Sequence, residues 1–311
     1  MTRLIGALLV SSLFVAGQRP AGAQGQALAG TITLSGAWAI YPTAVAWAEA
    51  FQALHPGVKV DVSAGGAGKG AADAIAGLVD IGMVSRDPDP AEVRKGIVPV
   101  YVLHDAVYPV VSDKNPALAE LLSKGVKRDT WAAIYITGTA TTWDDVVGTK
   151  VGKALHVYTR SDACGAAAGW AGYLGKRQED LRGVGVYGDP GLLEAAKRDP
   201  VGVGFSNFSY VFTRAGGVVP GARLVPIDSN DNGIADPDEI CDRRDAAVRA
   251  IEAGRYPATR RNYFFVKGRP QDLVREFLTF ALSDAGTRVV DEVGTSLPLP
   301  KAEREEVLRG L

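Results

Sequence analysis

The sequence predicts an α/β protein with mainly parallel strands, divided into two lobes of ordinary size. Short β-rich runs alternate with helix-like runs along most of the chain, which is the pattern of layered α/β folds. With 311 residues, 47% of them hydrophobic, the chain is too long for one small domain and can bury a core in each of two lobes.

The first segment has the composition of a secretory signal peptide. A basic start at Arg3, an apolar run over Leu4–Ala16 and small residues at Ala21–Ala23 are typical of such a signal. The apolar run is too short to span a bilayer. We therefore expect residues 1–23 to be removed and the mature protein to be periplasmic or secreted. The alternative is a buried N-terminal helix.

The charge balance limits the possible partners. Removing residues 1–23 deletes Arg3 and Arg19 and changes the net charge from -1 to -3. This balance argues against binding to nucleic acid or to an anionic lipid surface. If the protein binds an anion, backbone donors and one or two Arg side chains must hold it. In an exported chain, Cys164 and Cys241 could form a disulfide or remain two separate thiols.

The predicted elements begin at residue 31. Apolar residues at Val45, Ala48 and Phe51 share one side of a helix. We expect strands over residues 31–34, 58–62, 80–84, 98–103, 106–111, 155–158 and 263–266, and helices over 44–54, 70–78, 117–122, 130–134, 166–174 and 271–282.

Three loops lead from a β-like run into a helix through small or polar residues. They are Ser35–Tyr41, Ser63–Gly70 and Arg160–Ala166, and Ser85–Asp87 is a fourth polar corner. Helix N-termini expose free N–H groups and a positive dipole end, so small residues there let an oxyanion approach closely. We expect the loops to converge at the carboxyl ends of strands.

Arg160 is the candidate cation for this anion site. A guanidinium matches an oxyanion with two parallel hydrogen bonds. Its alternative role is a surface ion pair with Asp162. The only histidines, His55, His104 and His156, lie in no catalytic motif, so we predict that the protein is not an enzyme.

Three of these segments resemble those of the periplasmic phosphate-binding proteins of ABC transporters. They are Ser35–Pro42, Asp80–Arg86 and Tyr158–Ala166. Further similar segments are Gly188–Gly191, Val203–Asn207 and Ala253–Pro257. The resemblance covers nearly the whole mature chain.

The resemblance implies a type II periplasmic-binding-protein fold, in which two α/β lobes are joined by a two-strand hinge and close on the anion. We expect one lobe to comprise residues 27–107 and 260–311, and the other residues 108–259. The implied function is the capture of inorganic phosphate by a monomer that passes it to an ABC transporter permease in the inner membrane. The residues expected to bind phosphate are Gly36, Ala37, Trp38, Ala39, Ile40, Ser63, Ser85, Arg86, Arg160, Asp162, Cys164, Gly165 and Ala166.

Two departures from the family pattern bear on the choice of anion. Better-known members have an acidic residue where Arg86 stands, and it accepts the proton of phosphate. They also have hydroxyl residues where Cys164 and Ala166 stand. Another oxyanion such as sulfate or molybdate therefore remains an alternative ligand. We expect Asp162 or Asp87 to replace the missing acid, and we favour Asp162 because it shares a loop with Arg160.

A calcium-type loop lies at residues 228–239. Oxygen-bearing side chains occupy loop positions 1, 3, 5, 9 and 12, with Gly233 at position 6 and a backbone carbonyl at position 7. The expected ligands of a structural calcium ion are Asp228, Asn230, Asn232, Ile234, Asp236 and Glu239. The segment before the loop, 223–227, is predicted as a strand, so the loop is not part of a paired EF-hand. The alternatives are a solvated turn and, for the whole protein, a calcium-dependent exported interaction module.

Overall fold

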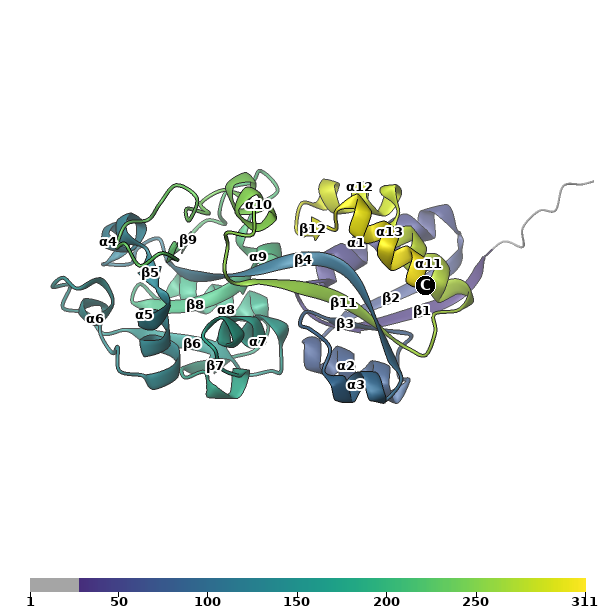
Figure 1. The fold of residues 1–311 in the computed structure, drawn as a ribbon, viewed down its shortest axis with the longest axis horizontal. Coiled ribbons are helices and arrows are strands. Elements are labelled where there is room, and N and C mark those ends of the chain that lie inside the picture. The colour runs from purple at the N-terminus through teal and green to yellow at the C-terminus, as the bar shows by residue number, and fades with distance from the viewer. Residues whose placement is uncertain (1–27) are drawn as a thin grey trace, which may run out of the picture.

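The computed structural model describes residues 28–311, and the predicted signal peptide lies outside them. Figure 1 shows two lobes of helices and strands, with two long strands running between them. This arrangement is the α/β, two-lobed fold that the sequence predicts. Among the described residues, no helix combines the length and apolar character needed to cross a membrane.

The first lobe is built on three parallel strands, with β1 in the middle between β2 and β3. The chain returns to this lobe at its C-terminal end, where α1 packs against α12 and α11. Its elements are β1 (Ala29–Gly36), α1 (Tyr41–Leu54), β2 (Gly57–Ala64), α2 (Ala67–Ala76), β3 (Ile81–Val84), α3 (Pro90–Arg94), α11 (Asp272–Leu282), α12 (Asp284–Val293), β12 (Leu297–Pro298) and α13 (Lys301–Gly310).

The second lobe has β6 in the middle of a parallel group with β7 and β8. Its elements are α4 (Leu118–Lys124), β5 (Val126–Lys127), α5 (Arg128–Ala132), the π-helix η1 (Ala133–Thr137), α6 (Trp143–Val147), β6 (His156–Arg160), α7 (Gly165–Tyr173), the 3-10 turn η2 (Gln178–Asp180), β7 (Val184–Val186), α8 (Asp189–Arg198), β8 (Gly202–Asn207), α9 (Phe208–Val211), β9 (Ala222–Leu224), β10 (Ile227–Asp228) and α10 (Arg244–Glu252).

Two antiparallel strands, β4 (Ile97–Ser112) and β11 (Thr259–Lys267), connect the lobes. They give the continuous strand order β2-β1-β3-β11-β4-β8-β6-β7. The prediction of two separate strands over 98–103 and 106–111 is wrong, because β4 is one strand. Its central polar residues are accommodated by partners, since His104 contacts Tyr101 and Asp105 pairs with Arg260.

Each lobe has its own hydrophobic core. In the first lobe, Trp47 packs edge-on against Phe264 at 5.8 Å between ring centroids. In the second, Trp131 packs edge-on against Trp170 at 5.4 Å. The two cores separate within β4, between Leu103 and Ala106, and near the start of β11, between Ala258 and Tyr263. Leu297, from the C-terminal part of the first lobe, also packs in the second core. This separation supports the lobe boundaries near residues 107 and 260, which we propose.

Candidate anion-binding site

The first loop of the site is pressed tightly against its own lobe. Gly36 ends β1 with φ +131°, a conformation that favours glycine. A Cβ there would collide with the carbonyl oxygen of Met83 and with Gly70. The N–H of Ala37 donates to that same oxygen of Met83 at 2.8 Å. The loop Gly36–Ile40 is therefore fixed at the carboxyl ends of β1 and β3, as the sequence predicts.

Loops from the two lobes touch each other. The N–H of Gly68, in the first turn of α2, donates to the carbonyl oxygen of Ala163 at 3.0 Å. A Cβ on Gly165, at the start of α7, would collide with the backbone oxygen and the hydroxyl of Ser85. The structure thus brings loops of the first lobe against the start of α7 and closes the space between them.

Arg160 lies at the end of β6 and is buried, although it carries a charge. Its side chain is 0% exposed. Nε and Nη2 donate to the two oxygens of Asp162 at 2.8 and 2.6 Å. Nη1 lies 2.7 Å from Oδ2 of Asp189 as an ion pair, but makes no well-aligned hydrogen bond. The pair with Asp162 exists, but the guanidinium is buried and the carboxylate partly buried, so it is not the surface pair considered as an alternative.

Asp189 is a candidate site residue that was not predicted from the sequence. It occupies the first position of α8, directly after Gly188, and its side chain is 3% exposed. A Cβ on Gly188 would lie 3.4 Å from the indole ring of Trp38. Asp189 therefore sits between the first loop and Arg160. Only the resemblance of the Gly188–Gly191 segment pointed towards it.

Several buried polar atoms around this place have no hydrogen-bond partner among the described residues. Such atoms are costly to bury, and a bound ligand or water can satisfy them. The unpartnered atoms include Trp38 Nε1, Arg160 Nη1, Asp189 Oδ1, Ser206 Oγ, Asn207 Nδ2, Ser209 Oγ and Arg260 Nη1.

A hydrogen bond also links the two lobes in this region. The hydroxyl of Tyr210, in α9, donates to the carbonyl oxygen of Trp38 at 3.0 Å.

Arg260 brings a second guanidinium to the hinge side of this region. It pairs with Asp105 across β11 and β4, and both side chains are nearly fully buried. It also donates to the side-chain oxygen of Asn207. No local pattern marks Arg260 in the sequence, because its partners lie 155 and 53 residues away.

The remaining predicted residues lie at different depths. Ser63 is exposed and donates to the carbonyl oxygen of Leu34 at 3.2 Å. The guanidinium of Arg86 is turned to Glu92, which accepts from both of its terminal nitrogens at 2.9 and 2.6 Å. Burial disfavours ionisation of Glu92, but the hydrogen bonds from Arg86 outweigh this effect and lower its pKa. Arg86 therefore has a partner other than the anion, and its contact with the anion stays a prediction.

The start of α7 presents backbone donors and a neutral thiol. The first N–H groups of a helix, here those of Gly165 and Ala166, have no intrahelical acceptor. Cys164 caps the helix, and its sulfur accepts from the N–H of Ala167 at 3.4 Å. Burial raises the pKa of the Cys164 thiol to about 12, so it adds no negative charge. Cys164 and Cys241 are both free and buried.

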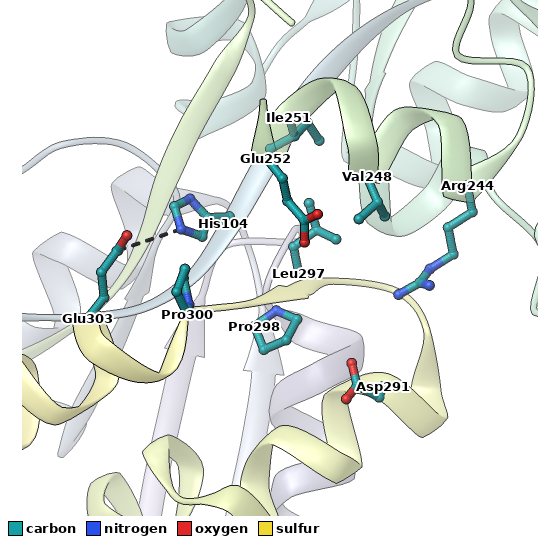
Figure 2. Close-up of a pocket in the computed structure, with 10 residues that line it drawn as sticks. All are labelled: His104, Arg244, Val248, Ile251, Glu252, Asp291, Leu297, Pro298, Pro300 and Glu303. Carbon is teal, nitrogen blue, oxygen red and sulfur yellow. Dashed lines mark ion pairs between the residues drawn. The ribbon is translucent and has the colours of Figure 1, made fainter. Parts of the chain in front are cut away.

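A separate cavity of about 450 Å³ lies between the lobes near the hinge (Figure 2). Its walls come from α10 in the second lobe and from α12, β12 and α13 in the first. His104 and Glu303 face each other in it at 3.6 Å. None of the residues predicted to bind the anion lines this cavity, so it is distinct from the candidate site.

The calcium-type loop is folded by its own hydrogen bonds. Asp228 is buried, and its oxygens accept from the N–H groups of Asn232 at 3.2 Å and Gly233 at 2.9 Å. Glu239 Oε1 accepts from the N–H of Ser229 at 2.6 Å. Within residues 28–311, no group of three or more His, Cys, Asp or Glu side chains is close enough to hold a metal ion. The loop thus has an ordered form in which backbone donors occupy the carboxylates.

The other predicted ligands lie in the same loop. Asp236 Oδ2 accepts from the side-chain amides of Asn230 at 2.8 Å and Asn232 at 2.9 Å. The carbonyl-bearing residue at position 7, Ile234, is 59% exposed. The N–H of Ala235 donates to the carbonyl oxygen of Ser123 at the end of α4, so the loop is attached to the body of the second lobe.

Comparisons with known proteins agree with this architecture. Residues 21–285 match the family model of a PBP superfamily domain. The chain is 27% identical over 290 residues to Protein SphX of Synechococcus elongatus, covering 86% of this chain and 77% of that protein. It is 24% identical over 257 residues to the phosphate-binding protein PstS of Bacillus subtilis, covering 82% and 76%.

Solved structures show the same fold. A putative phosphate ABC transporter substrate-binding protein from Clostridium perfringens, solved with bound phosphate, superposes with a TM-score of 0.71 at 22% identity, covering 87% of this chain and 100% of that chain. An ABC-type phosphate transport receptor from Vibrio cholerae gives 0.62 at 18% identity, with the same coverage. The predicted fold class is confirmed.

Proposed function

Because this chain belongs to the PBP superfamily, we propose that it captures inorganic phosphate between its two lobes and delivers it to an ABC transporter. The observation that carries this proposal is the buried Arg160, placed where loops of both lobes meet and surrounded by unpartnered polar atoms. A guanidinium with backbone donors suits a tetrahedral oxyanion. The PstS and SphX relatives support phosphate as that oxyanion.

The cellular setting belongs to the same proposal. The signal-peptide pattern of residues 1–23 suggests export, and the protein would then meet its permease at the outer face of the inner membrane. We infer that it acts as a monomer and does no chemistry on its ligand. The absence of a catalytic sequence motif around His55, His104 and His156 supports this inference.

The proposal is tested by calorimetric titration of phosphate into dialysed protein. We expect saturable heat with one phosphate per chain. Equal binding of phosphate, sulfate and molybdate would favour a generic oxyanion-binding protein. No heat with any of the three anions would contradict oxyanion capture and favour an interaction module.

We also propose that the loop of residues 228–239 binds a structural calcium ion. The proposal is supported by the match of every loop position to the calcium pattern and by the ordered loop attached to α4. Calcium would replace the backbone donors around Asp228 and Glu239. An isolated loop of this kind in an exported protein would bind weakly, with a Kd on the order of 10⁻⁴ to 10⁻³ M.

Chelation tests the calcium proposal. Binding to the folded state alone stabilises it by mass action, so millimolar calcium should raise the melting temperature above its value in chelator. Asp228→Ala should abolish this difference, whereas Asp238→Ala, at a loop position that supplies no ligand in the pattern, should retain it. Identical melting curves of the unaltered protein with calcium and with chelator would contradict the proposal.

A further inference from the structure

The charges at the anion site do not favour a fully ionised ligand. Asp162 engages Arg160 through both of its oxygens, and Asp189 faces the third guanidinium nitrogen. One buried guanidinium is thus flanked by the buried carboxylate of Asp189 and the partly buried carboxylate of Asp162. The second cation nearby, Arg260, is paired with Asp105. The site therefore has a net negative charge before any anion enters, and an added anion is repelled unless one carboxylate becomes a hydrogen-bond partner.

Asp189 has the one free carboxylate oxygen suited to this role. Its Oδ2 faces Arg160, whereas Oδ1 is buried without a partner among the described residues. An unpartnered buried carboxylate oxygen is costly, and a hydrogen-bond donor on a ligand relieves that cost. Burial removes water from the carboxylate of Asp189 and raises its pKa. The charges of Arg160 and Arg260 act in the opposite direction but do not cancel this effect.

The other acidic groups near the loops are already engaged. Asp162 accepts from Arg160 with both oxygens, and its Oδ1 also accepts from the N–H of Gly188 at 3.3 Å. Both of its oxygens therefore already have partners, in contrast to Asp189, and Asp162 is the weaker candidate for accepting a ligand proton. Asp87 is exposed and accepts from the hydroxyl of Tyr263 at 2.9 Å. Glu92 holds Arg86. These contacts leave Asp189 as the candidate acceptor.

We propose that Asp189 determines the specificity of the site, because its free Oδ1 accepts a hydrogen bond from an oxyanion that carries a proton. This inference rests on the proposed function and specifies its ligand class as protonated tetrahedral oxyanions. Hydrogen phosphate and hydrogen arsenate offer the required O–H group. Sulfate and selenate have a similar shape and the same charge as hydrogen phosphate but no proton at neutral pH. They therefore leave Oδ1 without a donor and place an oxygen against it instead of an O–H group.

The ligand-side test uses the unaltered protein. Phosphate, arsenate, sulfate and selenate are compared at pH 8 as competitors of radiolabelled phosphate. We expect arsenate to compete, and sulfate and selenate to bind at least about a hundredfold more weakly, because a site built to pair a ligand proton rejects analogues that lack it. Selenate or sulfate competing as well as arsenate would overturn the inference, while phosphate binding itself would stand.

The variant test uses Asp189→Asn, which keeps the shape of the side chain and removes its charge. Its amide can donate to an unprotonated oxyanion, so we expect the phosphate-to-sulfate affinity ratio to fall at least about tenfold. Asp87→Asn is the matched control and should keep the original ratio. An unchanged ratio in Asp189→Asn overturns the inference and leaves phosphate capture intact. Absence of phosphate binding to the unaltered protein overturns both.

Discussion

Arg160 combines a structural cost with the role in anion binding that we propose for it. Its charge is removed from solvent and is held by Asp162 and Asp189. Removing one member of such a set of buried, paired charges usually destabilises a protein, because the remaining charges stay buried without partners. The arrangement holds a guanidinium rigidly in the space between the lobes. An anion that enters this space meets a donor group whose orientation is already set.

Replacing Arg160 should weaken phosphate binding far more than replacing Arg86. We expect Arg160→Ala to cost about 2 to 5 kcal/mol of binding free energy, the range for losing one partner of a buried, hydrogen-bonded charge pair. Arg86→Ala should cost less than about 1 kcal/mol, because its guanidinium is paired with Glu92 at a partly exposed position. Calorimetric titrations measure both, with melting curves to check folding. Equal losses in the two variants would contradict this assignment.

The site residues differ in how far local sequence could reveal them. The loop at Gly36–Ile40 and the segment around Arg160 have recognisable local patterns, small residues before a helix and a cation beside donors. Asp189 shows no pattern of its own, because its role arises from a contact with Arg160 made only in the folded chain. Arg86 was predicted to bind the anion, but its pairing with Glu92, in the first turn of α3, appears only in the folded chain.

At the scale of elements, the periodicity of apolar residues predicted most of the strands and helices, but it did not predict that a single long strand, β4, connects the lobes. The polar pair His104 and Asp105 interrupts the apolar run of β4, and so the sequence suggests two strands. Pairing with β11 continues through this point, because Arg260 neutralises Asp105 directly across the ladder. Local patterns do not show such a partner when it lies in a distant strand.

The buried pair of the hinge strands should be important for stability. Asp105→Asn removes one charge and leaves Arg260 buried, so we expect a loss of about 3 to 5 kcal/mol in the free energy of unfolding. The exposed pair of Lys59 and Asp61 provides the comparison, and Lys59→Ala should cost less than about 1 kcal/mol. Urea denaturation measures both. A loss at Asp105 as small as that at Lys59 would show that the hinge pair does not stabilise the fold.

For the whole molecule, the contacts between lobes describe a closed form. Gly68 bonds to Ala163, Tyr210 bonds to the carbonyl oxygen of Trp38, and Arg244 of α10 donates to the carbonyl oxygen of Gly294 at 2.9 Å. Two antiparallel strands joining two separate cores form a connection that can act as a hinge. We infer that ligand capture is coupled to the closure of these contacts.

Gly165 allows a direct test of that closure. Gly165→Ala adds a methyl group that would collide with Ser85 of the other lobe, while its own backbone conformation remains accessible to alanine. We expect normal folding, at least about tenfold weaker phosphate binding, and no compaction in small-angle scattering when phosphate is added. Gly172→Ala is the matched control in the same helix, because a Cβ there meets nothing within 4 Å. Normal compaction of Gly165→Ala would contradict the closed arrangement.

The central claim is that phosphate is held between the lobes by Arg160, and a crystal structure of the protein grown with phosphate tests it most directly. The account predicts one tetrahedral anion enclosed by the loop Gly36–Ile40, Arg160 and the start of α7, with Asp189 Oδ1 within hydrogen-bond distance of one of its oxygens. An anion bound elsewhere, or closed lobes without an anion at saturating phosphate, would contradict the account.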